Sequence, residues 1–234
     1  MDLSTLLNID RYMLLSLNGS DSLFWDGCSL IYTSIAIWMP LLFVLLCVLL
    51  RNNNIKNFLL ILLLIAVATT LTHVISAAIC KPFFERWRPT NDPMLMFAVD
   101  TVNGLRETKY GFISSHAANS FGIATFLMLL IRNKAWTNSL IIWATINAFT
   151  RIYLGVHYPG DILCGALVGV IVGYSIYRLY VYIQNKNRRT SRRDWISNNY
   201  TKGGYLVTDI YFLLVVMYLT FIAIPIISFF TFQY

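Results

Sequence analysis

The sequence predicts an all-α fold: a polytopic membrane helix bundle of about six transmembrane helices with an N-terminal interfacial helix. Hydrophobic residues make up 57% of the 234 residues and charged residues only 12%, whereas a soluble domain is about half apolar and a quarter charged. The mean hydropathy is +0.62. The apolar residues also occur in long runs rather than in alternating stripes. These observations exclude a soluble globular domain.

Six apolar runs approach the length of about 20 residues that a helix needs to cross a bilayer. They are residues 28–50, 58–80, 112–131, 138–156, 161–183 and 208–230. The preceding stretch, residues 5–27, mixes Leu, Tyr, Phe and Trp with Asp, Ser and Asn. It is too polar to span and is more typical of a helix that lies at the interface. Because no internal repeat divides the chain, residues 1–234 are predicted to form a single domain.

Lysine and arginine mark one side of the membrane. One set of connections carries Arg51, Lys56, Arg132, Lys134, Lys186, Arg188, Arg189, Arg192, Arg193 and Lys202. The other carries Asp2, Asp10, Asp21, Asp26, Glu85, Asp92, Asp100 and Glu107. The positive-inside rule makes the basic side cytoplasmic and turns both termini outward, toward the periplasm in a Gram-negative cell. We interpret the basic segment 184–203 as a topology anchor, with a functional tail as the alternative. The net charge of +7 therefore does not indicate a nucleic-acid partner.

Polar residues interrupt the apolar pattern in three patches, each at an outward helix end. The first patch runs from Lys81 to Pro89 and holds Lys81 and Arg88 among prolines. Two fixed cations in a rigid segment favour an anion clamp. The alternative is a pair of interfacial side chains that extend to the membrane surface.

The second patch, Ile113-Ser114-Ser115-His116, opens the third apolar run. The N-terminus of a helix presents free backbone N–H groups and a partial positive charge, and both favour phosphate. Ser114 and Ser115 can cap that helix and donate to phosphate oxygens, and His116 would be a proton donor beside the anion. An ordinary serine cap next to an interfacial histidine is the alternative.

The third patch is Thr150-Arg151 followed by Gly155-Val-His157-Tyr-Pro-Gly-Asp161. His157 and Asp161 lie four residues apart, at the entry of the fifth apolar run, so their side chains can meet. A carboxylate that holds one imidazole nitrogen leaves the other free to attack. A structural His–Asp pair is the alternative, although ionisable residues at such depth are usually functional.

Other features carry weaker expectations. His73 is interpreted as a buried hydrogen-bonding group, with a supporting functional role as the alternative, and Asp209 as a helix cap. Gly165, Gly169 and Gly173 allow close helix packing, within the bundle or at a dimer face. The segment 99–110 is a candidate substrate-facing hairpin, with its turn at Asn103-Gly104. The four cysteines have no metal-like spacing, and no disulfide is expected.

The three patches read Lys81-x6-Arg88-Pro89, Ser114-x-His116 and Arg151-x5-His157-x3-Asp161. They resemble the signatures of the type 2 phosphatidic acid phosphatase family, which shares its core with vanadium haloperoxidases. The resemblance covers residues 81–161. Ile113 and Ser115 stand where the family usually has proline and glycine, and Thr150 replaces a serine. Two spans precede the first signature here, fewer than in other six-span members.

The resemblance implies a membrane phosphatase that needs no metal and no cofactor. His157 would attack phosphorus and form a phosphohistidine, with Asp161 orienting it. His116 would protonate the leaving oxygen and then activate water. The expected phosphate-binding residues are Lys81, Arg88, Ser114, Ser115 and Arg151.

A site at the bilayer surface suits a lipid phosphate whose tail stays in the membrane. Candidates are undecaprenyl diphosphate, phosphatidic acid, phosphatidylglycerol phosphate and the lipid A phosphates. An outward site on an inner-membrane protein favours undecaprenyl diphosphate or lipid A, and the first of these is our leading hypothesis. An anion or lipid transporter is the main alternative, but transporters usually hold charges near mid-membrane and contain repeats. An inactive family member, phosphotransfer to an acceptor other than water and the oligomeric state stay open.

Overall fold

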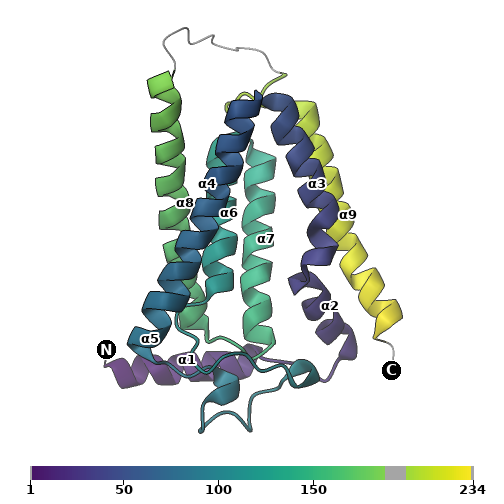
Figure 1. The fold of residues 1–234 in the computed structure, drawn as a ribbon. Coiled ribbons are helices and arrows are strands. Elements are labelled where there is room, and N and C mark those ends of the chain that lie inside the picture. Colours follow the sequence, from purple (N-terminus) through teal and green to yellow (C-terminus); the bar gives the residue numbers. More distant parts are fainter. Residues whose placement is uncertain (1, 188–198, 233–234) are drawn as a thin grey trace.

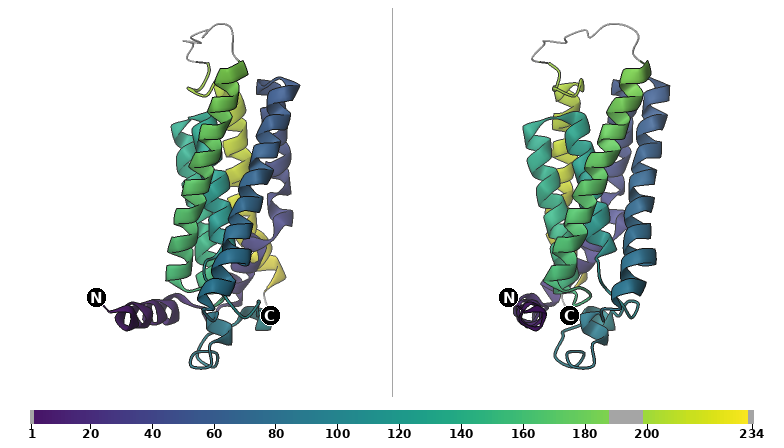
Figure 2. Two further views of the ribbon diagram at one scale, coloured as in Figure 1. Left: turned by 60° about the vertical axis from the view of Figure 1, so that its left-hand side comes forward. Right: turned by 90° about the vertical axis from the view of Figure 1, so that its left-hand side faces the viewer.

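Long helices standing side by side form the body of the molecule (Figures 1 and 2). The computed structural model describes residues 2–187 and 199–232, so most of the basic segment 184–203 lies outside the described residues. The helices are α1 (Leu3–Leu17), α2 (Leu23–Thr33), α3 (Ile35–Asn52), α4 (Ile55–His73), α5 (Lys81–Phe84), α6 (Ser115–Ile131), α7 (Lys134–Tyr153), α8 (Pro159–Asn187) and α9 (Val207–Thr231). The prediction of an all-helical membrane bundle is confirmed.

Four helical stretches in the described part of the chain are long and apolar enough to cross a membrane. They are residues 35–52, 55–84, 159–185 and 207–231. Helix α6 is apolar but shorter, and α7 carries more polar residues, yet both run along the bundle beside the others (Figure 1). The number of six spans therefore stays a prediction.

The N-terminal segment differs from the single interfacial helix predicted over residues 5–27. Helix α1 lies across one end of the bundle (Figure 2), and α2 is a separate helix that begins at Leu23. Gly19, with a positive φ of 64°, makes the turn between them. The Asn18 amide Nδ2 holds this turn by donating to the Tyr153 carbonyl oxygen at 2.8 Å. Ser34 then breaks the predicted first span 28–50 by capping α3.

The second span extends beyond its predicted limits because α4 continues through a π-helical turn, Val74–Cys80, into α5. The buried hydroxyl of Ser76 in this turn lies 2.6 Å from the Ser115 hydroxyl. His73 was expected to be buried, but it is exposed. A π-helical turn has more residues than an α-helical turn, so it shifts which side chains share a face along this helix.

Helix α6 lies at the centre of the bundle and packs closely against α8. A side chain at Gly165 would approach the Ser114 carbonyl oxygen to 2.6 Å, and one at Gly173 would approach Thr125 Cβ to 2.9 Å. The glycine stripe therefore packs inside the bundle, which confirms that alternative over a dimer face.

Replacing Gly169 with alanine should lower the thermal unfolding midpoint in detergent. The added methyl group would lie 3.0 Å from the amide nitrogen of Gly122 and still closer to the Ala118 carbonyl oxygen. Overpacking of this kind costs about 1–3 kcal/mol. The control is Gly122→Ala, whose methyl group would meet the nearest atom at 3.4 Å, an ordinary contact. Equal midpoints for the two variants would contradict this account of the stripe.

Two further expectations are wrong. Asp209 does not cap α9 but ties it to α3, accepting from Asn52 Nδ2 at 2.8 Å and pairing with Arg51 at 3.3 Å. The segment 99–110 forms a 3₁₀ turn, Val102–Gly104, rather than a hairpin. Tyr110 instead pairs with Trp87 in an isolated bridge. The turn at Asn103-Gly104 is present, with positive φ at both residues.

Candidate active site

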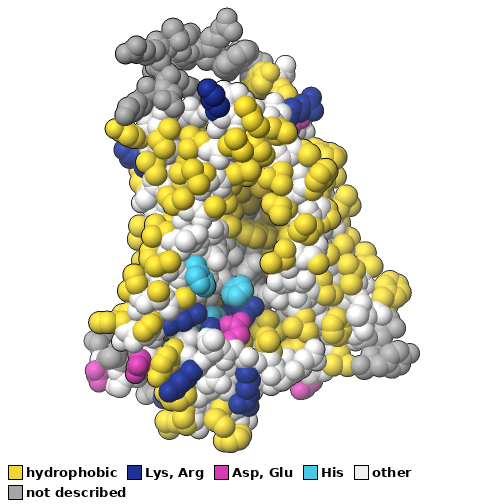
Figure 3. Space-filling model, viewed as in Figure 1, with side chains coloured by type: hydrophobic (Ala, Val, Ile, Leu, Met, Phe, Trp, Pro, Cys, Tyr) yellow, Lys and Arg dark blue, Asp and Glu magenta, His cyan; other side chains and the backbone are white. Residues whose placement is uncertain are grey.

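Histidine, basic and acidic side chains gather in one hollow near the end of the bundle that α1 crosses (Figure 3). The three polar patches of the sequence meet here. Arg88 of the first patch lies 2.8 Å from His157 of the third, and the Lys81 ammonium lies 3.4 Å from the Ser115 hydroxyl of the second. The fold thus brings together groups that are far apart in the sequence.

His157 lies in the short connection between α7 and α8, and local sequence explains its position. Gly155 adopts a φ of 70° and turns the chain after α7, and Pro159 begins α8, as proline can at a first helical position. Asp161 follows in the first turn, where a carboxylate is favoured. His157 is 1% exposed and Asp161 is fully buried. The turn therefore delivers a buried imidazole and a buried carboxylate to each other.

The partners of the imidazole define its tautomer. Nδ1 of His157 faces Asp161 Oδ2 at 3.4 Å, and Nε2 faces an Arg88 N–H at 2.8 Å. Nδ1 therefore carries the proton, and Nε2 keeps its lone pair. Burial, together with the cations of Arg88 and Arg151, holds the pKa of His157 well below its usual value. A neutral imidazole with an unprotonated Nε2 can act as a nucleophile.

Two buried guanidinium groups line the same hollow. Arg88 and Arg151 are 2% and 4% exposed, and both pair with the carboxylate of Glu107. The Nε–H groups of the two arginines are buried without an acceptor among the described residues. Buried donors are normally satisfied, so these two N–H groups fit the oxygens of a bound anion.

The start of α6 contributes the second patch. Ser114 is buried, its hydroxyl accepts from the Ala117 amide at 3.4 Å, and its own amide donates to the Asp161 carbonyl oxygen at 3.1 Å. Its contacts join α6 to the Asp161 turn, and a contact with phosphate stays a prediction. The Ser115 hydroxyl is bonded to Ser76 and Lys81. His116 is exposed to the hollow, and the charges of Arg151, Arg88 and Lys81 act on its ring.

Comparison with known proteins identifies the arrangement. The model of the PAP2 superfamily matches residues 57–185, more than half of the chain. The chain belongs to the PAP2 superfamily. The match contains all three patches, so this protein is a PAP2-type phosphatase and an integral membrane protein.

Individual relatives also support membership of the PAP2 superfamily. A lipid A 4′-phosphatase of Bacteroides thetaiotaomicron is 39% identical over 74% of this chain and 77% of its own. A lipid A 4′-phosphatase of Porphyromonas gingivalis is 33% identical over 77% of each chain. The crystal structure of a transmembrane PAP2-type phosphatidylglycerolphosphate phosphatase from Bacillus subtilis shares the fold. It has a TM-score of 0.56 and 21% identity, over 80% of this chain and 90% of that one.

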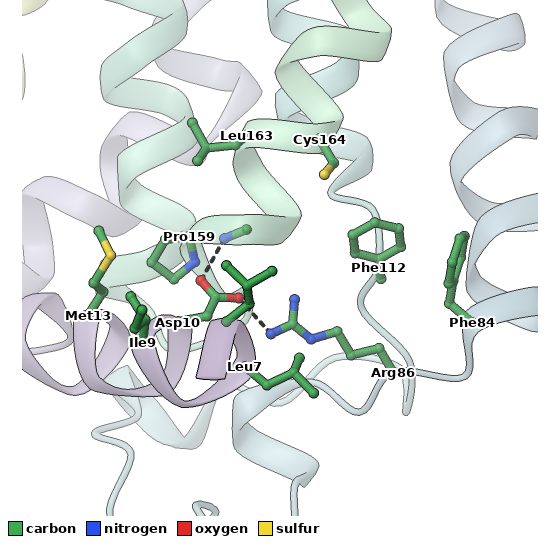
Figure 4. Close-up of a pocket in the computed structure, with 12 residues that line it drawn as sticks. Leu7, Ile9, Asp10, Met13, Phe84, Arg86, Phe112, Pro159, Leu163 and Cys164 are labelled. Carbon is green, nitrogen blue, oxygen red and sulfur yellow. Dashed lines mark hydrogen bonds and ion pairs between the residues drawn. The ribbon is translucent and has the colours of Figure 1, made fainter. Parts of the chain in front are cut away.

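Arg86 lies within the first PAP2 signature but was not singled out from the sequence. Its guanidinium donates to Asp161 at 2.7 Å and to Asp10 of α1 at 2.6 Å, and it lies 4.1 Å from the centre of the Tyr158 ring. Burial alone would lower the pKa of Arg86, but the two carboxylates raise it above its usual value. Asp10 also accepts from the Gly160 amide at 2.7 Å. Helix α1 thus contacts the turn that carries His157 and Asp161, through Asp10 (Figure 4).

An apolar groove of about 620 Å³ lies beside this contact, between α1, α5 and the start of α8 (Figure 4). Its apolar lining includes Leu7, Met13, Phe84, Phe112 and Leu163. Asp10 and Arg86 form its polar wall. The groove therefore brings an apolar surface next to the polar network of the PAP2 site.

Proposed function

We propose that this PAP2 phosphatase removes a phosphate monoester from lipid A. The carrying observation is the extent of the similarity to the two lipid A 4′-phosphatases, which covers about three quarters of each chain. The relatives described as undecaprenyl-diphosphatases match only 35% and 26% of this chain. These differences move our preference from undecaprenyl diphosphate, the leading hypothesis from the sequence, to lipid A.

The geometry supports a two-step mechanism. Nε2 of His157 attacks phosphorus, and the bond from phosphorus to the sugar oxygen breaks. Asp161 keeps the proton on Nδ1 and stabilises the charge that develops on the imidazole. His116 gives its proton to the leaving oxygen. It then takes a proton from the water that hydrolyses the phosphohistidine and releases inorganic phosphate.

The cations supply the electrostatic part of this mechanism. Phosphoryl transfer relies mainly on positioning and on stabilising the charge of the equatorial oxygens. Lys81, Arg88 and Arg151 lie where they can provide that charge, with the Ser115 hydroxyl and the free N–H groups at the start of α6 beside them. We therefore propose that the reaction needs no metal ion.

We also propose six spans, with α6 and α7 crossing beside the four longer apolar stretches. The site lies at the end of the bundle opposite the C-terminus of α3, which carries Arg51 (Figure 1). The positive-inside rule then directs the site to the periplasmic side of the inner membrane. The apolar groove beside α1 would accommodate an acyl chain of the substrate while the phosphate occupies the hollow.

Phosphate release by the purified protein in detergent, with chelator present, tests the proposal. We compare lipid A, undecaprenyl diphosphate, phosphatidic acid and phosphatidylglycerol phosphate, and analyse the lipid product by mass spectrometry. We expect lipid A to give a kcat/KM at least about ten-fold above the others, which corresponds to about 1.4 kcal/mol of differential transition-state binding. A preference for undecaprenyl diphosphate, which the two shorter matches support, would replace lipid A as the substrate. Transfer of phosphate to another lipid instead of water would contradict the hydrolytic step.

A further inference from the structure

Glu107 fills the position between the two buried arginines of the site. Its Oε2 lies 2.9 Å from Arg88 Nη2, and its Oε1 pairs with Arg151 Nη2. Its charge also acts on both His116 and His157. A carboxylate that accepts from two guanidinium groups makes the contacts that two oxygens of a phosphate would make.

We infer that Glu107 is a specificity-determining residue, an internal anion that occupies the phosphate position between turnovers and yields it to phosphate monoesters in preference to phosphodiesters. This inference rests on the proposed function, because it takes the cation cluster as the phosphate site. Arg88 and Arg151 cannot pair with Glu107 and with a substrate through the same N–H groups. A phosphate that binds the Nη2 groups as well as the two unpaired Nε–H groups therefore displaces the carboxylate.

Charge and tethering explain the selectivity. A phosphate monoester carries about −1.5 to −2 at neutral pH and presents three oxygens, so it exceeds a carboxylate in both respects. A phosphodiester carries a single charge and presents two free oxygens, which gives it no advantage over Glu107. Since Glu107 is part of the chain, it competes at a high effective concentration. The phosphodiester headgroups of the surrounding bilayer would thus be kept out of the site.

The surroundings of Glu107 allow the movement. The backbone here is held by Asn91 Nδ2, which donates to the Glu107 carbonyl oxygen at 3.1 Å, and by the Arg88 amide, which donates to the Lys109 carbonyl oxygen at 3.0 Å. The side chain itself is 26% exposed, unlike the two arginines. It can swing out of the hollow while the loop keeps its backbone contacts.

The carboxyl group of Glu107 also stays ionised near neutral pH. Burial would raise the pKa of its carboxyl group, but Arg151 and Arg88 lower it, and the result lies below the usual value for glutamate. The internal anion is therefore present at neutral pH and at mildly acidic pH.

Tungstate binding tests the inference without any turnover. The dissociation constant is measured from the tungstate-dependent shift of the thermal unfolding midpoint, for the wild type and for Glu107→Gln. If the wild-type site is open about a tenth of the time or less, the variant should bind tungstate about ten-fold more tightly or better. Glu85→Gln is the matched control, since Glu85 is exposed on the neighbouring segment and the charge change is the same. Glu85→Gln should bind tungstate with the same dissociation constant as the wild type.

A second arm measures the selectivity. Phosphatidylglycerol, a phosphodiester with one charge, is added to the phosphatase assay. It should leave the wild type and Glu85→Gln unaffected and should become a competitive inhibitor of Glu107→Gln. If Glu107→Gln does not fold, Glu107→Asp is used, because the shorter side chain cannot reach both arginines and should also bind tungstate more tightly.

Unchanged or weaker tungstate binding by the Glu107 variants would overturn the inference, because Glu107 would then serve to hold the arginines in place. Tighter tungstate binding without inhibition by phosphatidylglycerol would overturn the selectivity. Since tungstate binding needs no lipid substrate, a wrong choice of lipid A would leave this result interpretable. Failure of both the wild type and Glu107→Gln to bind tungstate would instead contradict the phosphate site itself.

Discussion

Replacing His157 with asparagine should lower the rate of lipid phosphate release by at least about 10⁴-fold, an effect typical of removing a catalytic nucleophile. The imidazole is 1% exposed and has its Nε2 lone pair directed at the cation cluster. Asparagine can pair with Arg88 or Asp161, but it cannot form the phosphohistidine. Two measurements are needed: initial rates of phosphate release, and the amount of acid-labile phosphate bound to the protein after rapid quenching.

His73→Asn is the matched control for this variant, because His73 is exposed and its side chain has no hydrogen bond or ion pair with the groups around Arg88 among the described residues. It should retain the wild-type rate and the labelled intermediate. A His157→Asn protein that still turned over within about a hundred-fold of the wild type would assign the attack to another group or to water, since loss of a nucleophile costs more than this.

Replacing Asp161 with asparagine should lower kcat by about 10²- to 10⁴-fold and change KM little, as expected for a carboxylate that orients a catalytic imidazole. Asp161 accepts from Arg86 at 2.7 Å through one oxygen and faces His157 Nδ1 at 3.4 Å through the other. The asparagine side chain has one oxygen and one NH₂ group, so its NH₂ group would face an N–H of either Arg86 or His157. His157 would then lose its preferred tautomer. Tungstate binding should persist, because Asp161 does not face the hollow.

Asp92→Asn gives the control for Asp161→Asn. Asp92 is also a buried acid next to this turn, where it accepts from the Tyr158 hydroxyl at 2.9 Å, but the structure gives it no contact with His157. The unfolding midpoints of both variants are measured alongside kcat. If both lost activity in proportion to stability, Asp161 would be a structural residue rather than a positioning residue.

The sequence predicted the parts of the site that depend on local spacing. His157 and Asp161 lie four residues apart around Pro159, so a helix entry brings them together whatever surrounds them. Arg86 and Glu107 were not predicted, because their roles depend on partners that lie 75 and 44 residues away. Arg86 is one of three cations in the segment from Lys81 to Arg88. Only the folded structure shows that Arg86 contacts Asp161, whereas Lys81 and Arg88 face the hollow.

Hydropathy located the helices, but packing decided their details. The apolar runs predicted the helical stretch 55–84, α8 and α9 to within a few residues, because length and apolarity alone define such helices. The predicted burial of His73 was wrong, because an apolar run locates a helix but does not show which of its faces packs against neighbours. The break between α1 and α2 depends on Asn18, whose partners Asp100 and Tyr153 come from distant segments.

The contact of Asp10 with Arg86 and Gly160 extends the polar network of the site beyond residues 57–185, the segment that matches the family. A protein trimmed to residues 57–185 would keep His116, His157, Asp161 and the three cations of the hollow. It would lose Asp10, and with it the carboxylate that holds Arg86 from the far side and the acceptor for the Gly160 amide. Arg86 would then have Asp161 as its remaining carboxylate partner among the described residues. We therefore expect Asp10 to contribute to turnover, so truncations or fusions at this end should be judged by turnover and not by folding alone.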